Sequence, residues 1–327
     1  MTLRLLAAAV LLLSSAQADA YAPEWGTLIL EHENDLFAGE DRYYTSGARI
    51  TWLAPGNRVP DWVRRGSRMV PMFDQDGELK LSYSLGQNMY TPDDITDPDP
   101  PDNDRPYAGW TYATVGIGSQ SDTRLDRLQL SIGMIGPASQ AHRFQKEIHR
   151  RLDSPQPAGW STQLRNEPAL LLTYERQWRR LAGSAGNGWG WDATPHLGGS
   201  LGNVFTQVAT GITGRLGWNL PADWGPPRIQ PALPGSGLFS ASSDVGGYVF
   251  VNVGGRIVAR DIFLDGNTFR DSRSVDKRYL VGEIQTGLAI NITRRFRLAY
   301  THVFPTREFR GQRGTQDFGS LSISAHF

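Results

Sequence analysis

The sequence contains no cysteine at all. This absence excludes a disulfide framework and a thiolate nucleophile, and it indicates a chain stabilised by burial or by closure of a sheet. Lysine and arginine together number 33 and equal the 33 aspartates and glutamates. A nucleic-acid partner would normally require a basic excess, so we expect none. Beyond the N-terminal region, no apolar run approaches the ~20 residues of a membrane-spanning helix.

The N-terminal region has the pattern of a secretory signal peptide at residues 1–20. Arg4 precedes an apolar run at residues 5–13, and the small residues Ala18 and Ala20 mark a cleavage site. The run is far shorter than a membrane anchor. The sequence shows neither an internal repeat nor an interdomain linker, so we expect one domain over residues 21–327.

Several segments alternate apolar and polar side chains with a period of two, which predicts half-buried strands. Clusters of Gly, Pro, Asn and Asp separate them, as in an antiparallel barrel or sandwich. Ten Trp and eleven Tyr residues, several near strand ends, favour a transmembrane barrel with aromatic girdles, whereas a secreted β-sandwich is the alternative. The aromatics considered include Trp52, Tyr90, Trp110, Tyr112, Trp189, Trp218 and Tyr248, and the clearest alternating segments are 79–90, 127–134, 280–291, 296–301 and 319–327.

Two segments break this alternation. Residues 91–106 hold five prolines and six aspartates, which predicts a loop that is either solvated or a cation site. Residues 138–152 place Ala141, Phe144, Ile148 and Leu152 at helical spacing, so we expect a short helix there. The helix could lie on the barrel rim or inside the lumen.

The segment EHENDLFAGEDRYYTSG, residues 31–47, concentrates oxygen-bearing side chains after the first expected strand. Asn34 and Asp35 stand about ten residues before Thr45 and Ser46, so two strand ends joined by a short loop would bring these groups together. Carboxylate and amide oxygens suit Ca²⁺ better than a transition metal. An Asn-Asp turn without any metal explains the same spacing.

Two histidines lie on the expected helix, His142 and His149, on neighbouring positions of one face together with Gln145. A histidine on a rigid helix suits a general base that activates water, because its unperturbed pKa of ~6.5 is close to neutral pH. A surface histidine without a catalytic role is the alternative for each. The glycine and serine patterns support neither a nucleotide site nor a serine nucleophile.

Six sequence blocks, in order along the N-terminal half, resemble the outer-membrane lipid A 3′-O-deacylases. The C-terminal half is similar mainly in its strand pattern. The blocks are ENDLF at 33–37, DRYYTSG at 41–47, QNMYTP at 87–92, DRPYAGW at 104–110, IGPASQAHRFQKEIH at 135–149 and GWSTQLRNEPALLLTYER at 159–176.

The resemblance implies an all-β fold, an antiparallel transmembrane β-barrel of about twelve strands in the bacterial outer membrane, with the helix near 138–152 packed in or on it. It implies Ca²⁺-dependent hydrolysis of the 3′-O-linked acyloxyacyl group of lipid A in the outer leaflet. Carried onto this sequence, the catalytic positions are Asn34, Asp35, Thr45 and His149, with Tyr44 beside Thr45 and with Asp35 as a metal ligand. We expect a monomer. The alternative is an inactive barrel with a structural, binding or pore role.

Overall fold

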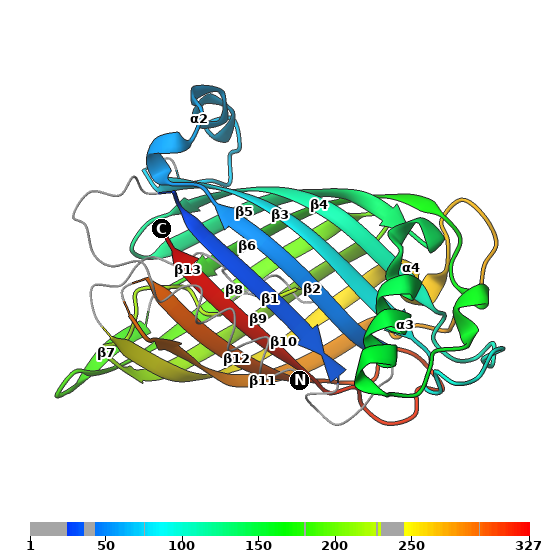
Figure 1. Cartoon of the computed structure of the whole chain (residues 1–327). Helices are drawn as coiled ribbons and strands as arrows, with labels where there is room; N and C mark the ends of the chain where they lie inside the picture. The colour runs from blue at the N-terminus through cyan, green and yellow to red at the C-terminus, as the bar shows by residue number, and fades with distance from the viewer. Residues whose placement is uncertain are drawn as a thin grey trace.

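The alternating segments pair with one another as antiparallel strands that curve into a barrel (Figure 1). The computed structural model describes residues 25–35, 43–74, 76–179, 181–226, 228–229, 245–293 and 295–327. The expected signal peptide at 1–20 lies outside these residues. So do Glu40 and Asp41 of the oxygen-rich segment.

Thirteen strands lie within the described residues, and each pairs antiparallel with its neighbour. The alternating segments expected from the sequence coincide with β3, β5, β11, β12 and β13. The strands are β1 (Thr27–Asn34), β2 (Tyr43–Leu53), β3 (Glu78–Thr91), β4 (Ala108–Gln120), β5 (Arg124–Ile135), β6 (Glu167–Trp178), β7 (Leu181–Gly186), β8 (Trp189–Gly202), β9 (Phe205–Trp218), β10 (Gly246–Asp261), β11 (Leu280–Asn291), β12 (Phe296–Pro305) and β13 (Phe318–His326).

The sheet closes on itself at two seams. β1 pairs with β13, which joins the two ends of the chain, and β6 pairs with β8, which completes the ring. β7 pairs with β8 alone and extends beyond the ring as a hairpin (Figure 1). Twelve of the thirteen strands therefore form the wall, and the expectation of about twelve is confirmed. Closure removes the unpaired edges that could not exist in lipid.

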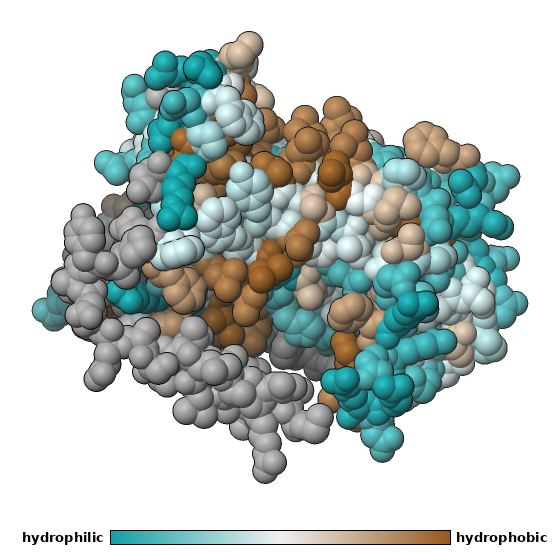
Figure 2. Space-filling view, turned by 45° about the horizontal axis from the view of Figure 1, so that its top comes forward, coloured by the Kyte–Doolittle hydropathy of each residue, from teal (hydrophilic) through white to brown (hydrophobic). Residues whose placement is uncertain are grey.

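The pleat of the strands turns apolar side chains outward and polar ones inward. On β3, Tyr83 and Leu85 are exposed on the outer face, whereas Ser84 points into the barrel and is buried. Figure 2 shows hydrophobic side chains gathered over the middle of the wall, with hydrophilic side chains at the right end. This is the arrangement of a barrel that lipid surrounds.

The aromatic residues considered for girdles divide into an exposed group and a buried group, so the girdle expectation is wrong for the buried ones. Trp52, Trp189 and Trp218 are exposed near strand ends, as expected for a girdle. Trp110 and Tyr248 are buried instead, because the inward pleat places them in the lumen. Tyr90 and Tyr112 are buried in the lumen in the same way.

Short helices occupy both ends of the barrel. They are α2 (Asp61–Ser67), α3 (Ala141–Leu152) and α4 (Ile262–Asp265), with 3-10 turns at Gly56–Arg58, Pro137–Ser139 and Gly159–Thr162. Within the described residues, none of the helices has the length and apolar character needed to cross a membrane. α3 and α4 lie at one end of the barrel, opposite the end where β1 begins and β13 finishes (Figure 1). The helix expected over 138–152 is confirmed as the 3-10 turn followed by α3.

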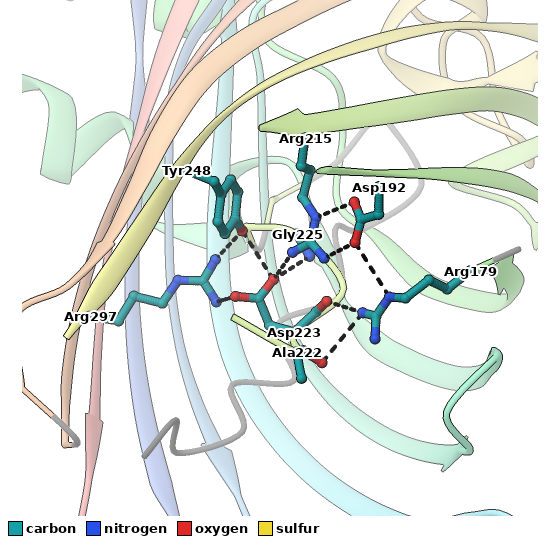
Figure 3. Close-up of polar contacts among 8 residues, drawn as sticks. All are labelled: Arg179, Asp192, Arg215, Ala222, Asp223, Gly225, Tyr248 and Arg297. Carbon is teal, nitrogen blue, oxygen red and sulfur yellow. Dashed lines mark hydrogen bonds and ion pairs between the residues drawn. The ribbon is translucent and has the colours of Figure 1, made fainter. Parts of the chain in front are cut away.

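The lumen of the barrel is filled from both ends. Near α3 and α4, Phe263 of α4 stacks on Tyr90 with ring centroids 3.9 Å apart, inside an aromatic cluster that includes Trp110. From the other end, residues 221–226 and 228–229 of the β9–β10 connection fold inward, and we call them the luminal segment. Asp223 of this segment meets Arg215 and Arg297 of the wall (Figure 3).

Candidate functional site

The residues expected to form the site gather where β1 and β2 end. The register pairs Asn34 with Ser46 across the two strands. The pairing of β2 with β3 slips between Tyr44 and Ser46, so Thr45 is the extra residue of a bulge. Asp35 follows β1 directly and is fully buried. Bulges often re-aim side chains beside functional sites, and the bulge residue here is itself one of the expected catalytic positions.

Asn34 and Thr45 share the outer side of the barrel wall. Glu33 and Tyr44 point into the lumen, where the Tyr44 hydroxyl donates to Glu33 Oε2 at 2.9 Å. The pleat therefore turns Asn34, the next residue of β1, outward. Thr45 is joined to Thr91 of β3 by a hydroxyl–hydroxyl hydrogen bond of 2.7 Å. These two positions of the expected site are thus on the lipid side of the wall rather than in the lumen.

A glycine beneath this site makes room for the Glu33–Tyr44 contact. A Cβ at Gly47 would overlap the Tyr44 hydroxyl, which passes across the glycine to reach the carboxylate. The glycine of the DRYYTSG block is therefore required by close approach. Sequence reasoning identified this block but assigned no role to Glu33 or to this glycine.

Helix α3 is held against the outer face of β3 and β4. The carbonyl oxygen of Ser139 accepts hydrogen bonds from Gln87 Nε2 at 2.7 Å and from Thr111 Oγ1 at 2.8 Å. Gly109 allows the close approach, because a Cβ there would overlap Ala141. Of the two positions left open by the sequence, the structure therefore places the helix on the outer wall at the rim.

The wall-facing side of α3 carries the histidine of interest. Its buried residues are Ala141, Gln145 and His149, spaced four apart along one face. Gln145 Oε1 accepts a 2.7 Å hydrogen bond from Trp160 Nε1, which fixes the helix to the 3-10 turn that follows it. Ala141 packs with Met89 in one buried cluster. Met89 is the cross-strand neighbour of Ser46, so α3 covers the same patch of wall that holds the oxygen-rich residues.

The ring of His149 has a defined tautomer in its neutral form. Its Nδ1 lies 2.6 Å from the carbonyl oxygen of Pro155, which can only accept. Nδ1 must therefore carry the proton, and Nε2 is then the basic nitrogen. His142 differs, because it is only half-buried on the same helix and its pKa is lowered by partial burial and by Arg143 and Lys146.

Cation ligands in this region would have to include more than carboxylates. Among the described residues, no group of three or more His, Cys, Asp and Glu side chains is placed to hold a metal ion.

In the acidic loop expected at 91–106, several carboxylates accept hydrogen bonds from backbone N–H groups of the same loop. Asp94 Oδ1 accepts from the Thr96 backbone at 2.8 Å, and Asp104 Oδ2 accepts from the Asp93 backbone at 2.8 Å. These contacts favour the interpretation of a solvated turn-rich loop.

Below the site, the lumen contains a chain of alternating charges that the sequence did not reveal. The backbone N–H of Ile229 donates to Glu33 Oε1 at 3.0 Å, and Arg228 lies 3.3 Å from Glu283. Arg256 continues the chain from Glu283 to Glu308. The luminal segment therefore reaches the residue that precedes Asn34. The only local signal was the position of Glu33 at the start of the ENDLF block.

A family model described as outer membrane protein LpxR matches residues 5–327. Among solved structures, LpxR from Salmonella typhimurium is 20% identical, with a TM-score of 0.76 over 92% of this chain and 100% of that chain. The β domain of the Bordetella autotransporter BrkA is 10% identical, with a TM-score of 0.44 over 91% of this chain and 96% of that chain. No match was found among curated proteins.

Proposed function

Because the chain belongs to the LpxR family of bacterial outer-membrane proteins, we propose that it is a lipid A 3′-O-deacylase. The reaction is hydrolysis of the ester that links an acyloxyacyl group to the 3′ oxygen of lipid A. The substrate is a lipid of the outer leaflet, and the enzyme would reach it from within the same membrane.

One observation carries the proposal: the oxygen-rich strand ends and the buried face of α3 lie on the outer side of the wall. Asn34 and Thr45 face away from the lumen, and His149 belongs to the side of α3 that covers this wall. A water-soluble substrate entering through the lumen would not meet them. A lipid headgroup at the rim would, because lipid surrounds this face of the barrel.

The donor atoms at the strand ends fit Ca²⁺. They are the carboxylate of Asp35, the amide oxygen of Asn34 and the hydroxyl of Thr45, all hard oxygen ligands, and the chain has no cysteine for a softer metal. Asp35 would hold the ion, with Asn34 and Thr45 as further ligands or as hydrogen-bond partners. When bound, Ca²⁺ would polarise the ester carbonyl and stabilise negative charge on its oxygen.

His149 would act as the general base in direct attack by water. Nε2 takes a proton from water as the water oxygen bonds to the ester carbonyl carbon. The tetrahedral intermediate then collapses, the bond from the carbonyl carbon to the 3′ oxygen breaks, and His149 returns its proton to that oxygen. The products are the free acyloxyacyl acid and a 3′-hydroxyl. Pro155 keeps the ring oriented throughout by accepting from Nδ1.

The test compares the two histidines of α3. We expect His149→Ala to abolish deacylation while the barrel keeps its heat-modifiable mobility on gels, and His142→Ala to retain most activity. Lipid A analysed by mass spectrometry provides the readout. Full activity in His149→Ala would contradict the mechanism.

The structure gives less support to the alternative of a pore. Within the described residues, the aromatic cluster around Phe263 fills one end of the lumen, and the luminal segment crosses the other. Conductance across a planar bilayer would distinguish the two functions. We expect the wild-type protein to conduct poorly, because side chains fill the interior of a narrow barrel.

A further inference from the structure

Helix α3 exposes the apolar side chains that a helix in water would bury. Phe144, Ile148 and Leu152 are 58%, 39% and 43% exposed. Gln145 and His149, which are polar, are buried against the barrel instead. For a helix surrounded by water this arrangement would be unfavourable, since exposed apolar area is costly.

The exposed apolar residues form a row along one flank of the helix. Phe144, Ile148 and Leu152 are four residues apart, and we call them the apolar row. Each of the first two immediately precedes a buried residue, Gln145 or His149, so the apolar row lies about a quarter turn from the wall contact. Charged side chains occupy the remaining sides of α3, at Arg143, Lys146, Glu147, Arg150 and Arg151.

The wall that carries α3 is itself lipid-facing. Leu85 is 62% exposed on the outer face of β3, two residues before Gln87, which binds the Ser139 carbonyl. The strand that holds the start of the helix therefore belongs to the wall whose outward apolar side chains Figure 2 shows. At the same end of the barrel, Tyr279 before β11 and Phe304 near the end of β12 are exposed aromatics, as in an interfacial girdle.

We propose that α3 is an interfacial helix whose apolar row inserts among the acyl chains of the outer leaflet. Three properties carry the proposal: an exposed apolar flank, a neighbouring flank fixed to the wall, and basic side chains on the remaining surface. Arg143, Lys146, Arg150 and Arg151 outnumber Glu147, which gives the helix an excess of positive charge beside the lipid phosphates. The lipid then holds the helix against the wall from the side that the protein leaves open.

This inference rests on the outer-membrane location and not on the proposed enzymatic activity. It also gives α3 a role besides carrying His149, because the bilayer itself would define the height of the helix on the wall. A bilayer of different thickness or headgroup charge would then change the position of α3 relative to β3 and β4.

The absence of native cysteine makes single-cysteine labelling direct. We would place an environment-sensitive fluorophore at Phe144→Cys and at Ile148→Cys, and reconstitute each protein in vesicles of phosphatidylcholine and phosphatidylglycerol. Leu85→Cys provides the lipid-exposed reference, and Arg150→Cys provides the water-exposed reference on the same helix. Each labelled protein must first show heat-modifiable mobility. Two positions in the apolar row keep the test available when one variant does not fold.

We expect labels at positions 144 and 148 to emit at shorter wavelength than the label at 150. Nitroxide-bearing lipid should quench them as it quenches position 85, and aqueous iodide should not. Quenching by iodide equal to that at position 150 would overturn the proposal. Protection from both quenchers would also overturn it, since a second copy of the chain or another protein would then cover the apolar row.

Discussion

The ion pairs around Asp223 provide a quantitative prediction about the luminal segment. One carboxylate oxygen lies 2.5 Å from Arg215 Nη1 and the other lies 2.6 Å from Arg297 Nη1 (Figure 3). The first oxygen also accepts from the Tyr248 hydroxyl at 3.1 Å and from the Gly225 backbone at 2.9 Å. All four contacts are buried, so removing the carboxylate would leave two guanidinium groups in the lumen without it.

Asp223→Ala should therefore lower the free energy of unfolding by about 3–5 kcal/mol, the usual cost of removing one member of a buried ion pair. Asp122→Ala is the matched control, because Asp122 is exposed on the β4–β5 turn at the same end of the barrel. A surface change of this kind should cost less than about 0.5 kcal/mol. The assay is reversible urea unfolding in lipid vesicles, followed by tryptophan fluorescence.

The same carboxylate gives the sign of a pH effect. Burial alone would raise the pKa of Asp223, but Arg297 and Arg215 outweigh burial and hold it below its ordinary value. A depressed folded-state pKa stabilises the protein fully above the unfolded value of about 3.9, and this stabilisation is lost as pH falls through the folded pKa. The stability difference between wild type and Asp223→Asn should therefore shrink only below about pH 4. If the free energies of unfolding of Asp223→Ala and Asp122→Ala agreed within error at pH 7, the reasoning would be refuted.

Two further predictions concern the attachment of α3. Gly109→Val should displace the helix, because the valine side chain would overlap Ala141 and Ser139. Overpacking of this kind costs about 1–3 kcal/mol. Deacylation should fall sharply, while the heat-modifiable mobility of the barrel remains. Trp160→Phe removes the N–H that donates to Gln145, and the lost hydrogen bond costs about 1 kcal/mol. Helix α3 should then be cleaved more readily by protease, and deacylation should fall in proportion. Wild-type turnover in either variant would show that the wall contact does not position His149.

The strands were predictable from the sequence because their signal is local. In β13 the sequence expectation at 319–327 differs from Phe318–His326 by a single residue at each end. In β11 the expected range coincides with Leu280–Asn291. Each outward residue meets lipid and each inward residue meets the lumen, so a period of two survives without knowledge of the partners.

The site was only partly predictable, since its contacts join distant segments. The convergence of Asn34 and Ser46 follows from a hairpin-like pairing of neighbouring strands. The place of α3 depends on hydrogen bonds from Gln87 and Thr111 to Ser139, which local periodicity does not encode. The luminal segment reaches Glu33 from nearly two hundred residues away, and no alternation pattern marks it. The roles of Asn34, Asp35, Thr45 and His149 in catalysis stay predictions.

The most direct measurement of the central claim is mass spectrometry of lipid A after incubation with the detergent-purified protein. The reaction should be run with Ca²⁺, with a chelator, and with Ca²⁺ restored after chelation. Ca²⁺-dependent loss of the 3′ acyloxyacyl mass, abolished in His149→Ala and retained in His142→Ala, is the predicted result. An unchanged lipid A mass in every condition, from a barrel that is folded by its heat-modifiable mobility, would contradict the assignment as a deacylase.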